Sequence, residues 1–296
     1  MEFDFLNVKS PNIKKPKVKS PLSPEITKMK ALLRKLNLHT VCEEASCPNI
    51  GDCFSRKTAT FMIMGNICTR RCLYCDVLTG RPSELDKEEP KNIAKAVKKL
   101  KLKYVVITSV NRDDLEDGGA SHFADVIYEI RKKNPNTKIE VLIPDFKFNW
   151  DYLKIVVDAK PDVINHNIET VPSLYSKVRH RGNYKKSLEL LRMVKVFDKN
   201  ILTKSGLMVG LGETKEEVIN VMKDLIDVDC DILTIGQYLQ PSISHLPVKK
   251  YYSDEEFKEF ENIGYKIGFK TVYSGQLVRS SFNAYEVFDK VKWSAF

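Results

Sequence analysis

The chain has 296 residues, of which 43% are apolar and 29% charged, and its formal net charge is +9. This composition excludes a disordered chain, a collagen and a coiled coil, and no run reaches the ~18 apolar residues that a membrane helix requires. The length suits either two domains or one α/β barrel, and the positive charge favours an acidic partner without identifying it.

Residues 1–57 are predicted to form an N-terminal extension. Residues 1–22 are rich in Lys, Pro and Ser and contain the basic run Lys14–Lys19, so we expect a flexible or extended arm there. Residues 24–38 place apolar side chains at the i, i+3, i+4, i+7 spacing of a helix. No basic segment followed by an apolar one opens the chain, so no secretory signal is expected. The expected location is the cytoplasm, or an organellar matrix if a transit peptide has been removed.

Apolar strands and amphipathic helices alternate through residues 58–240. The expected strands are 58–64, 104–108, 139–143, 162–168, 205–209 and 232–235. Helical apolar spacing follows at 93–100, 123–130, 149–158, 184–194 and 218–225. About six β/α units of this kind predict an α/β fold with a helix-covered parallel sheet. An open doubly wound sheet and a barrel, complete or partial, both fit, although no G-x-G-x-x-G motif follows the first strand.

The last part of the chain, residues 241–296, is predicted to be a C-terminal extension that covers the barrel. Its expected elements are a helix at 253–267 and a short strand at 271–273.

Six of the seven cysteines form two triplets in one short part of the chain. The first triplet is a C-x4-C-x5-C run made of Cys42, Cys47 and Cys53. The second triplet is a C-x3-C-x2-C run made of Cys68, Cys72 and Cys75. In a chain without a secretory signal, clustered thiols indicate metal ligands or redox groups rather than disulfides.

The second triplet predicts a 4Fe–4S cluster. A structural zinc site needs four ligands, and neither another cysteine pair nor a nearby histidine is present. A 4Fe–4S cluster takes one ligand per iron, so three cysteines leave one iron open. A zinc site and unligated structural thiols remain the alternatives. The first triplet argues for a second cluster whose missing ligand is distant in the sequence.

The second triplet, with Tyr74 before its last cysteine, resembles the radical S-adenosylmethionine superfamily. This resemblance implies a partial (β/α)6 TIM-type barrel in which the open iron binds S-adenosylmethionine, and one electron from the cluster releases a 5′-deoxyadenosyl radical. It also implies that Asn167 and Glu169 hydrogen-bond the ribose hydroxyls and that Arg181 pairs with the methionine carboxylate. Ordinary polar barrel residues and a surface arginine are the alternatives.

Two other stretches, Cys42–Cys53 and Val278–Phe282, resemble the lipoyl synthase family, and the resemblance covers nearly the whole chain after residue 24. It implies that Ser281 ligates the fourth iron of an auxiliary 4Fe–4S cluster held by the first triplet. For Ser281 alone, the alternative is the N-cap of a helix.

The same resemblance implies radical insertion of two sulfur atoms at carbons 6 and 8 of a protein-bound octanoyl-lysine, with two S-adenosylmethionine molecules per turnover. The implied substrate protein is an octanoylated lipoyl carrier domain, from a 2-oxoacid dehydrogenase acyltransferase subunit or the glycine cleavage H protein. The implied reductant is a flavodoxin or ferredoxin. Biotin synthase, a two-cluster electron carrier and a nucleic-acid-binding protein are the alternatives. Neither a nucleic acid nor a membrane is an expected partner.

Overall fold

The computed structural model describes residues 18, 23–55 and 60–293. Its centre is a single eight-stranded sheet with the order β1-β2-β3-β4-β5-β6-β7-β8. The strands are β1 His39–Thr40, β2 Thr60–Ile63, β3 Tyr104–Ser109, β4 Lys138–Leu142, β5 Val163–Asn165, β6 Leu202–Val209, β7 Ile232–Gln237 and β8 Thr271–Gly275.

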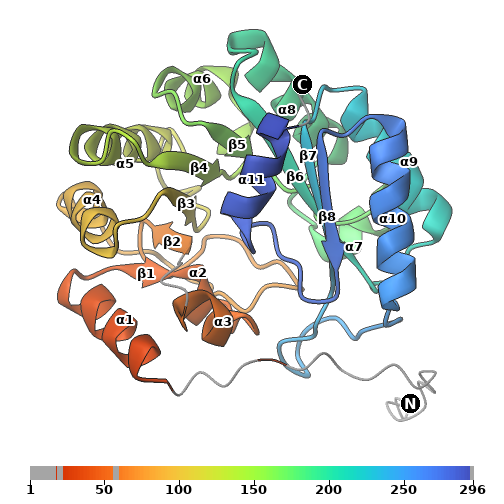
Figure 1. The fold of residues 1–296 in the computed structure, drawn as a ribbon, viewed down its shortest axis with the longest axis horizontal. Helices are drawn as coiled ribbons and strands as arrows, with labels where there is room; N and C mark the ends of the chain where they lie inside the picture. The colour runs from red at the N-terminus through yellow and green to blue at the C-terminus, as the bar shows by residue number, and fades with distance from the viewer. Residues whose placement is uncertain (1–17, 19–22, 56–59, 294–296) are drawn as a thin grey trace.

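The strand order identifies the sheet as a partial barrel (Figure 1). β1 pairs with β2 in the antiparallel sense, and every later neighbouring pair is parallel. A doubly wound sheet reverses its strand order at a switch point, whereas this order never reverses. β1 and β8 are the two edges of the sheet, so the barrel is open. The predicted α/β partial barrel is confirmed.

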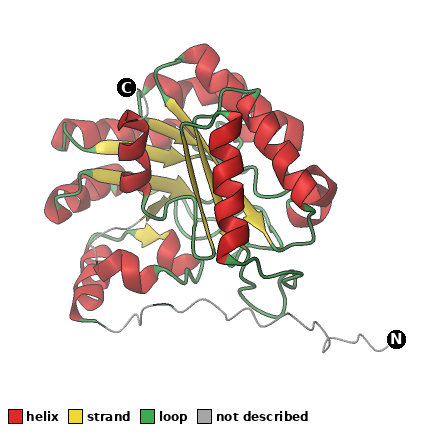
Figure 2. Ribbon diagram, turned by 45° about the vertical axis from the view of Figure 1, so that its right-hand side comes forward, coloured by secondary structure: helices red, strands yellow, loops and turns green. Residues whose placement is uncertain are grey.

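Helices surround the sheet: the long helices between successive strands cover its outer face, whereas the helix at 284–293 lies over the barrel interior (Figure 2). They are α1 Pro24–Lys35, α2 Val41–Glu44, α3 Ile50–Ser55, α4 Glu89–Leu100, α5 Ala120–Lys133, α6 Trp150–Asp158, α7 Tyr175–Val178, α8 Tyr184–Phe197, α9 Lys215–Ile226, α10 Asp254–Ile267 and α11 Ala284–Trp293, with the 3-10 turns η1 Phe146–Phe148 and η2 Pro172–Leu174. Thr214 and Glu217 form the capping box that starts α9. No described helix is long and apolar enough to cross a membrane.

Successive side chains of each strand point to opposite faces of the sheet, one toward the helices and one toward the interior of the barrel. Outward-facing residues such as Ile107 and Val141 are fully buried against the helices. Inward-facing residues such as Val106, Thr108 and Leu142 line a cavity instead. The barrel therefore provides a rigid wall for a central chamber.

The two extensions lie against the barrel rather than apart from it. α2 carries Cys42, α3 carries Cys53 and Cys47 lies between the two helices, while β8 adds a further parallel strand to β7. α11 contacts both β3 and β8, and its Phe288 ring packs 5.3 Å from the ring of Tyr104 (Figure 1). The division at 1–57, 58–240 and 241–296 remains a prediction. The arm expected at residues 1–22 lies outside the described residues, apart from Val18.

Candidate active site

A cavity of about 870 Å³ contains every site residue that the sequence predicted. Its lining includes Cys42, Cys47, Cys53, Cys68, Cys72, Cys75, Asn167, Glu169, Arg181 and Ser281. Apolar residues of the barrel interior, such as Val106, Leu142 and Met208, form part of its wall. One chamber thus brings together both cysteine triplets and the apolar surface that an acyl chain requires.

The second triplet lies on the long loop after β2. Cys68 is buried, and its sulfur accepts hydrogen bonds from the backbone N–H groups of Arg70 and Asn111, both at 3.4 Å. Burial raises the pKa of the Cys75 thiol to about 12 and also raises the pKa of Cys72. A bound metal reverses this tendency, because its positive charge deprotonates a coordinating thiol.

Within the described residues, no three His, Cys, Asp or Glu side chains converge on the position of a single metal ion. A 4Fe–4S cluster takes one thiolate per iron, so its ligands surround a cube instead of meeting at one atom. Three cysteines on one loop, facing a shared cavity, fit such a cluster in number and in chemistry.

Asn167 and Glu169 follow β5 and face the same cavity. The Asn167 Nδ2 donates to Glu169 Oε1 at 3.2 Å. Among the described residues, the buried Asn167 Oδ1 has no hydrogen-bond partner. Burial raises the pKa of Glu169, and the nearby Arg179 opposes this shift. A buried acceptor without a protein partner is available to a hydrogen-bond donor of a ligand in the cavity, and a hydroxyl group is such a donor.

Arg181 lies at the rim of the cavity, where its side chain is 60% exposed and its Nη1 is 3.9 Å from Asp113 Oδ2. Arg179, which sequence reasoning missed, lies closer to the predicted cofactor residues. Its Nη1 donates to the Asn167 carbonyl oxygen at 2.9 Å and to the Tyr175 hydroxyl at 3.1 Å. The four-residue spacing from Tyr175 is the sequence signal that favours this contact.

The first triplet meets the C-terminal segment on another side of the chamber. Asn49, between Cys47 and Cys53, donates from Nδ2 to the Leu277 carbonyl oxygen at 2.7 Å across 228 positions of sequence. Burial raises the pKa of Cys47, and the nearby Arg279 guanidinium opposes the shift. The C-terminal segment therefore lies beside the loop of the first triplet.

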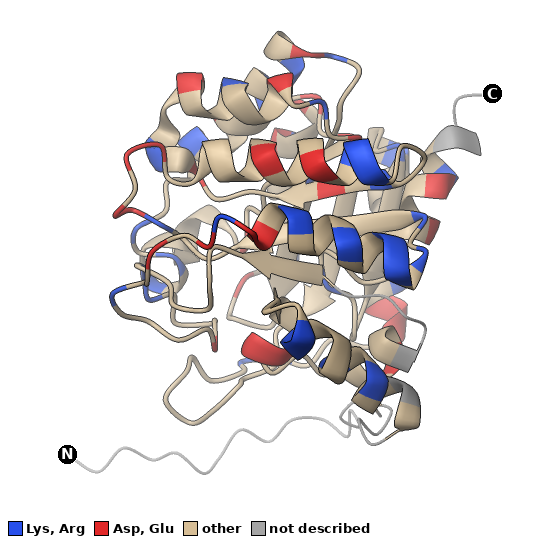
Figure 3. Cartoon of the chain, turned by 90° about the vertical axis from the view of Figure 1, so that its left-hand side faces the viewer, with Lys and Arg blue, Asp and Glu red and all other residues tan. Residues whose placement is uncertain are grey.

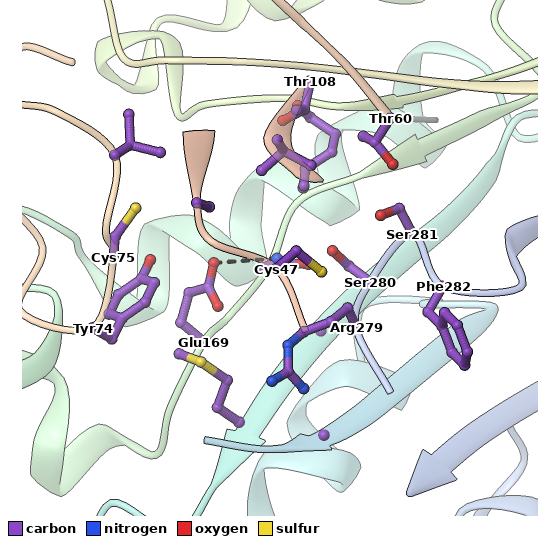
Figure 4. Close-up of a pocket in the computed structure, with 18 of the residues that line it drawn as sticks. Cys47, Thr60, Tyr74, Cys75, Thr108, Glu169, Arg279, Ser280, Ser281 and Phe282 are labelled. Carbon is purple, nitrogen blue, oxygen red and sulfur yellow. Dashed lines mark hydrogen bonds between the residues drawn. The ribbon is translucent and has the colours of Figure 1, made fainter. Parts of the chain in front are cut away.

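Ser281 precedes the last helix without being adjacent to it. α11 begins at Ala284, and its first turn is closed by the Val287 N–H, which donates to the Asn283 carbonyl at 3.0 Å. Ser281 is half-buried and faces the cavity, as Figure 4 shows together with Cys47 and Arg279. This placement does not support the N-cap alternative for Ser281.

Comparisons with known proteins agree with this architecture. Methylornithine synthase is similar over 91% of this chain and 92% of its own, with a TM-score of 0.54 and 14% identity. A maturase of the [FeFe]-hydrogenase covers 73% of this chain and 50% of its own, with a TM-score of 0.55 and 16% identity. These likenesses concern the fold alone. A model of the radical SAM superfamily matches residues 62–225, and the chain is therefore a radical S-adenosylmethionine protein.

Closer relatives define the family. A model of the N-terminal domain of lipoyl synthase matches residues 8–47. A lipoyl synthase of Caldanaerobacter subterraneus is 60% identical over 263 residues, which is 89% of this chain and 92% of the relative. One of Aquifex aeolicus is 58% identical over 262 residues, 88% of this chain and 95% of the relative. The chain belongs to the lipoyl synthase family. It is a radical enzyme that inserts sulfur into a protein-bound octanoyl group to make the lipoyl cofactor, and biotin synthase is not supported.

Proposed function

We propose that the chamber holds two 4Fe–4S clusters with different tasks. Cys68, Cys72 and Cys75 would hold the radical-generating cluster, and Cys42, Cys47 and Cys53 with Ser281 would hold the auxiliary cluster. The observation that supports this division is the single cavity lined by both triplets and by Ser281. The hydrogen bond from Asn49 to the Leu277 carbonyl keeps the C-terminal segment beside the first triplet.

The remaining residues position the reactants. When bound, the clusters and two molecules of S-adenosylmethionine per turnover supply carbon radicals and the sulfide that replaces two C–H hydrogens. Asn167 and Glu169 would orient the ribose hydroxyls, and Arg181 at the rim would pair with the methionine carboxylate. The inward-facing Val106 and Leu142 would hold the octanoyl chain and exclude water, so that carbons 6 and 8 lie between the two triplets.

Changing Ser281 tests the division of tasks. The wild-type chain is expected to contain about eight irons, four for each cluster. Ser281→Ala should keep 5′-deoxyadenosine formation, make little lipoyl product and contain less iron, because the auxiliary cluster loses its fourth ligand. Ser281→Cys should restore the iron content while releasing sulfide poorly, because a thiolate holds iron more firmly than a serine oxygen. Iron, sulfide and both products are measured on the same preparation. Wild-type lipoyl formation by Ser281→Ala would contradict the assignment.

The partner is proposed to be an octanoylated lipoyl carrier domain, of a 2-oxoacid dehydrogenase acyltransferase subunit or of the glycine cleavage H protein. Such domains are generally acidic, and this chain carries +9. No acidic residue occurs between residues 90 and 104, and exposed lysines line this part of α4 and the loop that follows it (Figure 3). A flavodoxin or ferredoxin is the proposed reductant. Iron–sulfur chemistry favours a reducing compartment, the cytoplasm or an organellar matrix.

Carrier binding is expected to weaken as salt rises, because exposed charges attract over a Debye length of ~8 Å at physiological ionic strength and over less at higher salt. The change should lie mainly in the association rate. Stopped-flow or surface binding between low and high salt measures it. A short octanoyl-lysine peptide without an acidic surface is the control and should bind almost independently of salt. Equal salt responses of carrier and peptide would refute the electrostatic contribution.

A further inference from the structure

The loop that carries the second triplet has almost no regular structure. Between β2 and α4 it contains turns and bends, with one isolated bridge between Cys68 and Thr79. Local backbone hydrogen bonds alone therefore do not fix the relative positions of three thiols. Contacts with other parts of the barrel must therefore hold the three thiols in place. Arg70 makes four side-chain hydrogen bonds of this kind.

Arg70 joins the loop to the ends of two strands. Its Nε and Nη2 donate to the two carboxylate oxygens of Asp113, at 2.8 and 2.7 Å. Its Nη1 and Nη2 donate to the two oxygens of Asp145, at 2.5 and 2.8 Å. Asp113 follows β3 and Asp145 follows β4, so one guanidinium bridges two segments of the barrel with two bidentate pairs.

One guanidinium pairs with two carboxylates, and the three side chains are largely shielded from water. The Asp145 side chain is 1% exposed, that of Arg70 11% and that of Asp113 26%. Hydrogen bonding to Arg70 lowers the pKa of Asp113. Burial would raise the pKa of Asp145, but its hydrogen bonds and charge interaction with Arg70 lower it. Both carboxylates are therefore ionised at neutral pH, and removing Arg70 would leave a buried negative charge without its cation.

The neighbours of Arg70 carry the restraint to the cysteines. The Arg70 backbone N–H donates to the Cys68 sulfur at 3.4 Å. The Thr69 hydroxyl lies 3.0 Å from Asp113 Oδ2 and 3.0 Å from the Asn111 carbonyl oxygen. The Asn111 N–H in turn donates to the same Cys68 sulfur. The loop is thus fixed to the barrel at Cys68 and at the two residues that follow it.

Arg70 has little capacity left for a reactant. A guanidinium has five N–H donors, and four hydrogen bonds already run from Arg70 to the two aspartates. Its function is therefore to place other groups. Arg71 beside it is exposed, which makes it a natural control.

We propose that Arg70 is a positioning residue that, through Asp113 and Asp145, holds the second triplet in the geometry required for productive S-adenosylmethionine cleavage. This inference rests on the proposed function of that triplet. It adds a residue whose effect is confined to the radical cluster and does not extend to the first triplet.

The test compares Arg70→Lys and Arg70→Gln with Arg71→Gln in the iron-loaded full chain. Lysine keeps the charge but cannot make two bidentate pairs. Because a displacement of about 1 Å can cost ~100-fold in rate, 5′-deoxyadenosine formation per loaded cluster should fall ~10-fold with lysine and ~100-fold with glutamine. The change in the electron paramagnetic resonance signal of the reduced cluster on addition of S-adenosylmethionine should weaken in the same order. Arg71→Gln should match the wild type in both measurements.

The auxiliary cluster provides an internal reference. Its iron and sulfide content should stay at the wild-type level in both Arg70 variants, whereas a general folding defect would lower both clusters and overturn the proposal. Adding Asp145→Asn to Arg70→Lys should lower the rate of 5′-deoxyadenosine formation by less than the two single changes combined, because both changes disrupt the same ion pair. Cleavage by Arg70→Gln at the Arg71→Gln rate would also overturn it. Absence of cleavage by the wild type would instead refute the proposed function of the triplet.

Discussion

Replacing Cys72 by alanine is expected to abolish reductive cleavage of S-adenosylmethionine, whereas replacing Cys47 should leave cleavage intact and abolish sulfur insertion. Both cysteines line the same chamber, so the contrast depends on their assigned clusters rather than on their exposure to substrate. Removing one of three thiolates leaves the radical cluster with two protein ligands, which is insufficient to hold a cube with an open iron. Anaerobic assays that count 5′-deoxyadenosine and lipoyl product in the same reaction measure both effects.

The two variants serve as controls for each other, because each removes one half-buried thiol from a three-cysteine run. Cys72→Ala should retain the iron of the auxiliary cluster, about four per chain, and Cys47→Ala the iron of the other. Undiminished 5′-deoxyadenosine production by Cys72→Ala would refute the assignment of the second triplet to the radical cluster. Sulfur insertion by Cys47→Ala would place the sulfur donor elsewhere.

Gly236→Ala is expected to abolish most sulfur insertion without touching a proposed ligand. Gly236 lies in β7, and a Cβ atom built there would stand 2.0 Å from the carbonyl oxygen of Val278. That oxygen belongs to backbone, so the segment that carries Ser281 must move. Overpacking of this kind costs about 1–3 kcal/mol, and the displacement should separate Ser281 from the first triplet. Thermal unfolding and lipoyl product formation measure the two consequences.

Gly275→Ala is the matched control for this change. A Cβ at Gly275 would meet only the Val278 Cγ2 atom, at 3.3 Å, which a side chain accommodates with a small shift. It should therefore retain most product formation. The Gly236 variant should still form 5′-deoxyadenosine, because the second triplet is remote from this contact in sequence and on a different loop. If Gly236→Ala makes lipoyl product at the wild-type rate, the position of the C-terminal segment is not important for catalysis.

The fold was largely predictable because its strands and helices have strong periodic patterns, and the exceptions have physical causes. The expected strand at 205–209 begins earlier, as β6 Leu202–Val209. Lys204 broke the apolar pattern, but its Nζ donates to the Glu140 carboxylate at 2.9 and 3.1 Å inside the barrel. A paired buried charge can continue a strand, and its partner on β4 is invisible to a local pattern.

The short helices and the supporting residues of the site were not predictable for a related reason. α2 and α3 have four and six residues, too few for an amphipathic repeat, and packing against the barrel stabilises them. The cysteines were found because their spacing is local. Arg70 and Asp145 are 75 residues apart, and only the barrel brings them together.

The bond between Asn49 and Leu277 has a consequence for how the molecule is made. Synthesis starts at the N-terminus, so the first triplet leaves the ribosome more than two hundred residues before Ser281. During that interval the segment that carries Ser281 is not yet available to the first triplet. The second triplet instead lies in a stretch whose supporting strands, β3 and β4, emerge soon afterwards. If the proposed assignment of Ser281 holds, loading of the auxiliary cluster requires the finished polypeptide. A chain truncated before Ser281 should then cleave S-adenosylmethionine and fail to insert sulfur.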